Sequence, residues 1–481
     1  MKKNRNSTTT TGVIWSAIER FSSQGLQFVF GIIIARLLMP YDYGLIGMIA
    51  IFLALSETFV QSGFGLALIQ KKNRDELDYS TSFYFNIVVA IFFYFFLFFF
   101  STKIADFYEE PVLVPLIRVI GLTIIINSCT VVQRTKLDIL LDFKTQTKAS
   151  VISVSLSGLI GLYLAYTGFG VWALVWQSIL RRLINTSILV FYLKWLPKAG
   201  FSLIRFKSLF SFGSKVLLVG LLNSIFSNLY LIVIGKIFNA SDLGYYTRAK
   251  QFSDFPSTNL VAIISRVTFP ILSKVQDDNE KLKSTYRQLI KLTAFIVFPF
   301  MVGLAALSKP FILLILTEKW SESIWMLQLL AFAGMWYPIN ILNLNILNVK
   351  GRSDLFLKLE VIKKIITVFF LILSIQFGLN IIIISQIVIA IISIFINTYY
   401  TKKIIGYGVG QQLKDVFKTL FLSIIMGISV FYLINIFNNL YVQLSIGIFV
   451  SVFIYFSSSY FLKMNELTQM VKYTKQFIYK N

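Results

Sequence analysis

Charged side chains inside long apolar segments are the residues of this chain whose types could do chemistry. The candidates for a cationic substrate-binding cavity are Arg20, Lys215, Arg248, Arg181 and Arg182. A charged side chain at a helix centre costs about 2.5–3.5 kcal/mol on insertion scales. We therefore expect each one to face a water-filled cavity or an opposite charge. Because guanidinium groups bind phosphate oxygens in pairs, such a cavity would suit an anionic substrate.

Acidic residues in the same segments are candidates for ion coupling or for charge pairing, namely Glu57, Asp254 and Glu19. Glu57 has no basic neighbour four residues away, so it could carry a coupling proton or pair with an arginine of the first apolar segment. Asp254 lies four residues after Lys250, and Glu360 four residues before Lys364, so pairing within a helix would neutralise both couples. Arg20 and Arg248 have two readings, a contact with substrate or ion pairing with acids such as Glu19 and Glu57.

Two absences exclude several classes of catalytic and metal site. The chain has no histidine and a single cysteine, Cys129. It therefore lacks the usual general base near neutral pH, imidazole ligation and a disulfide framework. We expect a protein that is not an enzyme and has no cofactor, with proton or sodium coupling left open.

The composition is that of an integral membrane protein. Hydrophobic residues make up 56% of the 481 residues and charged residues only 14%, where a soluble domain has about a quarter charged residues. Apolar segments long enough to cross about 30 Å of hydrocarbon predict an all-α fold of about 14 transmembrane helices. The predicted spans are 13–37, 43–69, 79–101, 112–133, 149–167, 170–193, 209–237, 243–272, 290–316, 323–348, 355–377, 380–401, 416–437 and 440–462.

The basic residues that give the net charge of +23 lie mostly in alternate connections between the predicted spans. Connections rich in lysine and arginine alternate with connections that are poor in them. Short basic loops stay cytoplasmic, so we expect a multi-pass protein of the bacterial inner membrane with both termini in the cytoplasm. The charge then reflects orientation and attraction to anionic membrane lipids, and nucleic acid is not expected as a partner.

A motif that recurs after about 200 residues, which we call the echo, predicts two similar halves, as in transporters built from parallel repeats. Residues 34–44 and 234–244 share an isoleucine, a basic residue and an Asp-x-Gly step, Asp42-x-Gly44 and Asp242-x-Gly244. We expect each glycine to adopt the positive φ of a tight turn. Six spans per half relate the lobes by a pseudo-twofold axis along the membrane normal. The predicted domains are 1–200, 201–403 and, with two additional helices and a basic tail, 404–481.

Several motifs resemble the Wzx-type polysaccharide flippases of the multidrug/oligosaccharidyl-lipid/polysaccharide exporter superfamily. They are Gly12–Ser16 with Ile34–Gly44, then Ser62–Gln70, then Arg266–Asp278. The last is especially similar to the branch that exports colanic and teichuronic acids. The resemblance implies a V-shaped, two-lobed exporter working by alternating access. It also implies an undecaprenyl-pyrophosphate-linked oligosaccharide as substrate, for O-antigen, capsule or exopolysaccharide assembly, with polysaccharide polymerase and assembly proteins as partners.

Two other functions compete with this interpretation. A multidrug or organic-cation antiporter of the same superfamily should have an acid-rich site, whereas basic residues outnumber acidic ones inside the predicted spans. A membrane-bound glycosyltransferase or polymerase usually has sizeable outer loops with acids or histidine. Here the longest outer connections, 102–111 and 316–323, are short. The flippase interpretation is therefore favoured.

Overall fold

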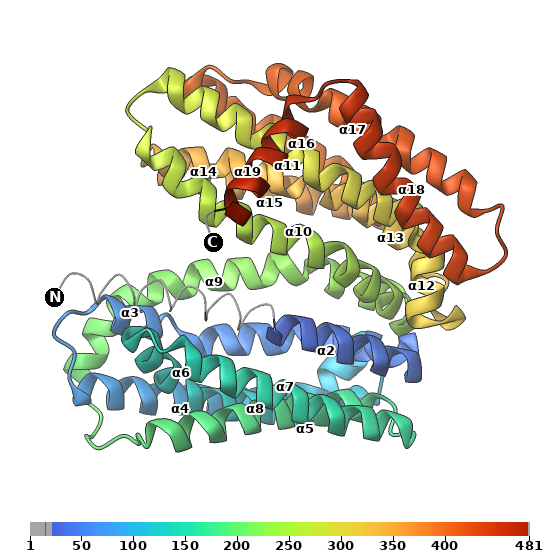
Figure 1. Ribbon diagram of the computed structural model, residues 1–481. Helices are drawn as coiled ribbons and strands as arrows, with labels where there is room; N and C mark the ends of the chain where they lie inside the picture. The colour runs from blue at the N-terminus through green and yellow to red at the C-terminus, as the bar shows by residue number, and fades with distance from the viewer. Residues whose placement is uncertain (1–14, 16–21, 480–481) are drawn as a thin grey trace. The chain divides into compact units, whose positions relative to one another are not determined.

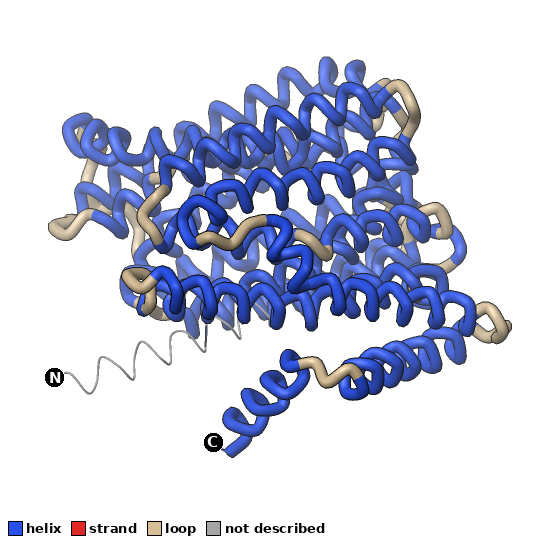
Figure 2. Tube along the Cα trace, turned by 90° about the horizontal axis from the view of Figure 1, so that it is seen from above, coloured by secondary structure: helices blue, strands red, loops and turns tan. Residues whose placement is uncertain are grey.

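All regular secondary structure in the described part of the chain is helical. The computed structural model describes residue 15 and residues 22–479 (Figure 1), and short loops join its helices (Figure 2). Residues 22–37 are helical. The later elements are α2(Pro40–Gln61), α3(Phe64–Gln70), α4(Glu76–Tyr108), α5(Leu113–Ile120), α6(Leu122–Leu140), α7(Phe143–Tyr166), α8(Val171–Leu193), α9(Leu203–Ile237), α10(Ala240–Lys274), α11(Asn279–Ala306), α12(Ser308–Leu316), η1(Glu318–Trp320), α13(Ser323–Gly334), α14(Tyr337–Val349), α15(Ser353–Ile375), α16(Leu379–Ile405), α17(Val409–Ile434), α18(Leu440–Phe461) and α19(Asn465–Tyr479).

The predicted all-α membrane fold is confirmed. Among the described residues, 10 helical segments are long and apolar enough to cross a membrane. Helices α8, α10 and α15 coincide with three further predicted spans but fall outside this set, and the predicted span 13–37 lies partly outside the described residues. The chain is a multi-pass membrane protein, and the count of fourteen spans stays a prediction.

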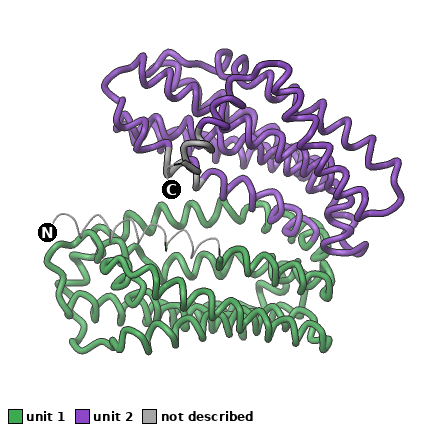
Figure 3. Tube along the Cα trace, viewed as in Figure 1, with its two compact units in different colours: residues 1–244 green, residues 245–481 purple. Residues whose placement is uncertain are grey.

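The chain forms two compact units, Met1–Gly244 and Tyr245–Asn481 (Figure 3). In unit 1, α7 packs on α8, α2 on α9 and α4 on α6. In unit 2, α11 packs on α17, and α15 on α16. The division describes packing, whereas the predicted domains 1–200, 201–403 and 404–481 describe a repeat, so the repeat boundaries stay a prediction.

Helix α17 is an integral part of unit 2. Its Val416 belongs to the same buried cluster as Tyr286 and Phe298 of α11. At one end of these helices, the Asp415 carboxylate is only 5% exposed and lies 3.2 Å from the Lys291 ammonium. It also accepts two hydrogen bonds from the guanidinium of Arg287, one of them at 2.6 Å. The apolar contact and the ion pairs together hold α17 against α11.

The two copies of the echo pack against each other through their glycines. A Cβ at Gly44 would lie 1.7 Å from the carbonyl oxygen of Ala240, and a Cβ at Gly244 would lie 1.9 Å from that of Pro40. Neither glycine has a positive φ, so the predicted tight turns are wrong. Both glycines lie in helices, and they are required because the two helix starts approach too closely for any side chain.

The aspartates of the echo stabilise those helix starts. The Met39 backbone N–H donates to the Asp42 carboxylate at 2.9 Å. In the second copy, the Asp242 N–H donates to the Asn239 side chain at 2.8 Å, and the Asn239 amide donates back to the Asp242 carboxylate at 2.8 Å. Asp42 therefore satisfies a backbone donor at the start of α2, whereas at the start of α10 Asn239 accepts from the backbone and the Asp242 carboxylate holds the Asn239 side chain. At both helix N-termini the negative charge of the aspartate is also favourable.

Candidate functional site

A hydrogen-bonded charge pair lies inside unit 1, among α2, α6 and α8. The Arg182 guanidinium donates to the Glu57 carboxylate at 2.7 Å, and the two side chains are 24% and 23% exposed. The same guanidinium donates to the Asn127 side-chain oxygen at 3.0 Å. Because both side chains are about three-quarters buried, pairing offsets part of the cost of removing their charges from water.

Positive charge exceeds negative charge around this pair. The Arg134 guanidinium donates to Asn185 at 2.9 Å, so a neutral amide receives it. Arg181 has no hydrogen bond or ion pair in the described part of the chain, and it interacts electrostatically with Arg182, Glu57 and Arg134. Among the described residues, the guanidinium groups of Arg134, Arg181 and Arg182 thus outnumber the nearby carboxylates of Glu57 and Asp138, which leaves the region attractive to an anion.

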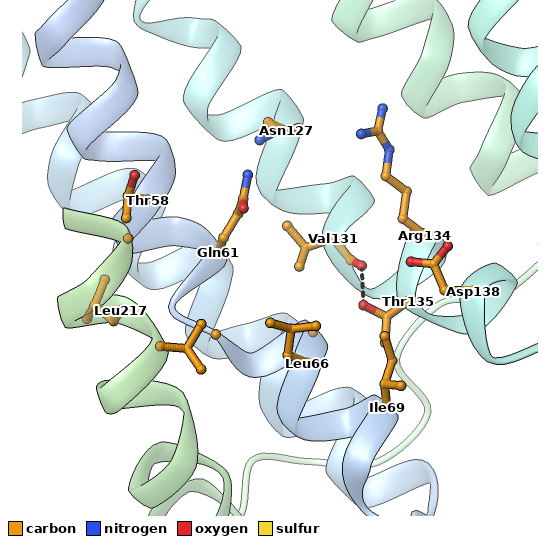
Figure 4. Close-up of a pocket in the computed structure, with 14 residues that line it drawn as sticks. Thr58, Gln61, Leu66, Ile69, Asn127, Val131, Arg134, Thr135, Asp138 and Leu217 are labelled. Carbon is orange, nitrogen blue, oxygen red and sulfur yellow. Dashed lines mark hydrogen bonds between the residues drawn. The ribbon is translucent and has the colours of Figure 1, made fainter. Parts of the chain in front are cut away.

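A pocket of about 310 Å³ adjoins this network (Figure 4). Asn127 and Arg134 belong to both, and Gln61 of α2 projects toward the same space (Figure 4). The lining residues come from α2, α3, α6 and α9 and the residue that joins α2 to α3: Thr58, Gln61, Gly63, Gly65, Leu66, Ile69, Asn127, Val131, Arg134, Thr135, Asp138, Val216, Leu217 and Gly220. Its polar lining consists of amides, hydroxyls, the Arg134 guanidinium and the Asp138 carboxylate, which accepts a hydrogen bond from Gln146 at 2.8 Å. The amides, hydroxyls and guanidinium can hydrogen-bond an anionic headgroup or a sugar.

A break between α2 and α3 shapes one side of this pocket. Ser62 and Gly63 both have positive φ, 44° and 68°, which ends α2 and redirects the chain. A Cβ at Gly63 would lie 2.6 Å from the Gly213 carbonyl oxygen of α9. Glycine is therefore required at position 63 both by its φ and by the close approach of α9.

Helix α9 is also joined to α2 by a polar contact. The hydroxyls of Thr58 and Ser224 lie 2.8 Å apart, and a Cβ at Gly220 would lie 2.9 Å from the Thr58 methyl group. The small residues of α9 let it approach α2 closely, as small residues do between membrane helices. The pocket wall is consequently built from sequence-distant helices.

The structure places the predicted site residues in different parts of the chain. Arg182 and Glu57 are paired, with Arg181 beside them. The predicted pairing of Glu57 with an arginine of the first span stays a prediction, because Arg20 is not among the described residues. Lys215 is exposed on α9 and has no hydrogen bond or ion pair among the described residues. Arg20 and Glu19 lie outside the described residues, so no contact is assigned to them.

Two predicted residues, Arg248 and Asp254, lie on α10 in unit 2. The Lys250 ammonium is 3.1 Å from the Asp254 carboxylate, which confirms the predicted i,i+4 pair. The Arg248 guanidinium donates to Gln251 at 2.6 Å. Both contacts are made within a single helix.

The other predicted intrahelical pair shifts by one residue. Lys363, three residues after Glu360, forms an ion pair with it. The spacings i,i+3 and i,i+4 both bring side chains together on a helix, so sequence spacing alone does not decide whether Lys363 or Lys364 pairs with Glu360. Glu360 is in either case engaged within its own helix.

Sequence reasoning missed Arg134, Asn127 and Gln61. The predicted fourth span ended at residue 133, which assigned Arg134 to a cytoplasmic connection, whereas α6 continues to Leu140. The available signal was helical spacing, because Asn127 and Arg134 lie two turns apart on one face of α6. Among the described residues, no group of three or more His, Cys, Asp and Glu side chains could hold a metal ion.

Comparisons with known proteins identify relatives along most of the chain. A family model described as "Polysaccharide biosynthesis protein" matches residues 33–325, more than half of the chain. The lipopolysaccharide biosynthesis protein WzxC of Escherichia coli (strain K12) is 28% identical over 361 residues, 74% of this chain and 73% of the relative. The teichuronic acid biosynthesis protein TuaB of Bacillus subtilis (strain 168) is 29% identical over 350 residues, 72% of each.

Solved structures share the fold. The lipid II flippase MurJ in an inward closed conformation has a TM-score of 0.75 at 18% identity, covering 94% of this chain and 99% of that one. An inward-facing multidrug resistance transporter of the MATE family has a TM-score of 0.60 at 14% identity, covering 82% and 98%. The predicted exporter fold is therefore confirmed.

Proposed function

The chain belongs to the polysaccharide biosynthesis protein family, and we propose that it is a flippase for a lipid-linked oligosaccharide. The substrate would be an undecaprenyl-pyrophosphate-linked repeat unit, moved across the bacterial inner membrane by alternating access. The product would enter the assembly of O-antigen, capsule or exopolysaccharide. This is transport without a chemical step on the substrate.

The observation that carries this proposal is the excess of guanidinium groups in unit 1. Arg134 lines the pocket, Arg181 has no hydrogen-bonding partner in the described part of the chain, and only Glu57 balances Arg182 directly. A pyrophosphate carries several negative charges and accepts paired hydrogen bonds from guanidinium groups. Amides such as Gln61 and Asn127 beside the arginines would bind sugar hydroxyls.

The relatives support the same substrate class. WzxC and TuaB are named for the biosynthesis of lipopolysaccharide and teichuronic acid, and the structurally similar MurJ is named for lipid II. These names concern bacterial surface polymers and their lipid-linked precursors. Arg20, Lys215 and Arg248 remain candidate contacts for the anionic group, and Glu57, Asp254 and Glu19 remain candidates for coupling or charge pairing.

The membrane setting follows from the distribution of charge. Lysine-rich and arginine-rich connections favour the cytoplasmic side, which would place both termini there in the inner membrane. Anionic lipids would contact these connections, and a polysaccharide polymerase with its assembly proteins would receive the product. Proton or sodium entry would supply the driving force.

The test neutralises Arg134, which lines the pocket, together with Arg181. In Arg134→Gln/Arg181→Gln, each lost charge-assisted contact is worth about 1.5–3 kcal/mol, or roughly tenfold to a hundredfold in binding. We expect export of the surface polysaccharide to fall while the amount of protein in the membrane stays the same. Unchanged export by this variant would contradict the assigned site.

Arg118→Gln is the matched control. Arg118 lies in α5 of the same unit, donates to Ser101 at 3.1 Å and contacts the Phe98 ring, and it does not line the pocket. Its neutralisation should leave export unchanged. Efflux of a cationic dye by the unmodified protein would indicate an organic-cation antiporter instead.

A further inference from the structure

Three polar side chains in unit 1 are buried without any hydrogen-bonding partner. Ser82 and Asn86 of α4 and Gln133 of α6 are each 0% exposed. The Ser82 hydroxyl, both polar atoms of the Asn86 amide and both of the Gln133 amide lack a partner in the described part of the chain. We call these three residues the open amide cluster.

The register of α4 against α6 brings the three residues within about one helical turn of each other. The helices run antiparallel: the Lys136 ammonium lies 4.3 Å from the Tyr79 ring centroid, and at the other end a Cβ at Gly121 would lie 3.2 Å from the Tyr94 ring. Counting inward from Tyr79 and Lys136 places Ser82 opposite Gln133. Asn86 follows one turn later on the same face of α4.

A buried amide without a partner is strongly disfavoured. Transfer of an amide from water to an apolar medium is unfavourable unless a new hydrogen bond replaces the lost ones. The hydrocarbon of a bilayer cannot form such hydrogen bonds. Two such amides and a hydroxyl within one helical turn therefore point to a small polar ligand. The unpartnered atoms include donors as well as acceptors.

We propose that the open amide cluster holds ordered water. A water molecule both donates and accepts, so it can satisfy the amide N–H groups and the amide oxygens together. A monovalent cation would satisfy the oxygens alone and leave the N–H groups unpaired. The cluster itself contains no carboxylate that would neutralise a bound cation.

A polar face of α4 connects the cluster with the end of the helix. Asp78, Ser82 and Asn86 follow one another at four-residue spacing, which places them on one face. Asp78 is fully buried and pairs with the Lys71 ammonium at 2.5 Å. Water entering beside this ion pair reaches the cluster along side chains that can hydrogen-bond it.

The first test compares variants that give opposite results in a dry and in a hydrated cluster. Asn86→Leu has a similar volume. In a hydrated cluster it removes hydrogen bonds to water, so the melting temperature of the full chain in nanodiscs should fall. In a dry cluster it removes an unsatisfied amide, and the melting temperature would rise or stay the same, which would overturn the proposal. Asn343→Leu removes an amide that has protein partners, and it shows how far the melting temperature falls when such hydrogen bonds are lost.

Two further measurements keep the proposal testable if Asn86→Leu fails to fold. A cryo-electron microscopy map of the unmodified chain, at a resolution that shows waters elsewhere in its interior, should show density between Ser82, Asn86 and Gln133. Empty space there would overturn the proposal. Melting temperatures in sodium chloride and in choline chloride should agree. If sodium raises the melting temperature and Gln133→Leu removes that rise, the cluster binds a cation and not water, and the proposal is wrong.

Discussion

Neutral amides are buried in both units, and the two groups of amides differ in what they bind. In unit 2, Asn343 and Gln412 exchange two hydrogen bonds, of 3.0 and 2.8 Å, and the Thr401 hydroxyl donates to Asn343 at 3.1 Å. We call these three residues the closed amide cluster. In the part of unit 1 that the structure describes, no amide atom of the open amide cluster has a protein partner.

The comparison shows two uses of the same side chains within a membrane. The closed amide cluster joins α14, α16 and α17 by direct hydrogen bonds, as polar residues do between membrane helices. A neighbouring pair extends this joint, because Asn397 donates to Asn340 at 2.9 Å and Asn340 donates to the Ala390 carbonyl at 3.2 Å. The open amide cluster instead leaves its hydrogen-bonding capacity for a solvent molecule, in the unit that also carries the guanidinium-rich pocket.

The largest effect should come from breaking the closed amide cluster. Asn343→Leu removes the reciprocal partner of the buried Gln412 amide and leaves the Thr401 hydroxyl only its 3.3 Å bond to the Asn397 carbonyl, so the free energy of unfolding should fall by about 2–3 kcal/mol. Unfolding in mixed micelles with increasing sodium dodecyl sulfate measures it. The double variant Asn343→Leu/Gln412→Leu should recover part of the loss, because both members of the pair are then apolar. A single variant as stable as the unmodified protein would show that the reciprocal bonds contribute nothing.

The charge pair of unit 1 should give the next largest effect. Glu57→Gln leaves Arg182 without its carboxylate, and since both side chains are about a quarter exposed, we expect a loss of about 1–2 kcal/mol. Export should also change, because the balance of charge beside the pocket changes. Arg182→Gln/Glu57→Gln is the control, and it should be more stable than Glu57→Gln alone. Equal stability of the single and double variants would mean that the pair is not coupled.

Gln133→Leu should give a smaller loss, about 1 kcal/mol, because water rather than a protein group leaves the open amide cluster. The same unfolding assay measures it. This value should be below that of Asn343→Leu. If Gln133→Leu proves the more damaging of the two, the distinction between an open and a closed amide cluster is wrong.

The smallest effect concerns the start of α4, which carries Ser82 and Asn86. The backbone N–H of Asp78, followed by the charges of Arg205 and Lys71, holds the pKa of Asp75 below its ordinary value. A lowered pKa in the folded state means that this stabilisation is present above the unfolded pKa of about 3.9 and is lost as the pH falls through the folded pKa. Asp75→Asn should flatten the acid side of a stability profile and cost no more than a few tenths of a kcal/mol at neutral pH, because Asn is also a good N-cap. If the stability profile of Asp75→Asn keeps the same slope at acid pH, other carboxyl groups are responsible for that slope.

The fold class was predictable from the chain because apolar length and loop charge are local properties. Ten described segments have the length and composition of membrane spans, and most coincide with predicted ones. Helix ends were less predictable, as Arg134 shows. A basic residue looks like the end of a span in sequence, while α6 continues past it to Leu140 and the Asn185 side chain accepts its hydrogen bond.

The candidate site was predictable in its members and not in its pairing. Glu57 and Arg182 both stand out as charges in apolar segments, but 125 residues separate them. No periodicity connects positions so far apart. Their contact depends on how α2 and α8 pack.

The echo around Gly44 and Gly244 shows the same division. By itself the sequence determined that two similar motifs precede apolar helices, that charged residues within those helices are mostly basic, and that the protein lies in a membrane, because composition and spacing suffice for these conclusions. Only the tertiary structure decided that the two glycines serve a close helix contact rather than a turn. It also decided which amides are paired and which are left open, because hydrogen-bond partners are chosen by packing between helices that are distant in sequence.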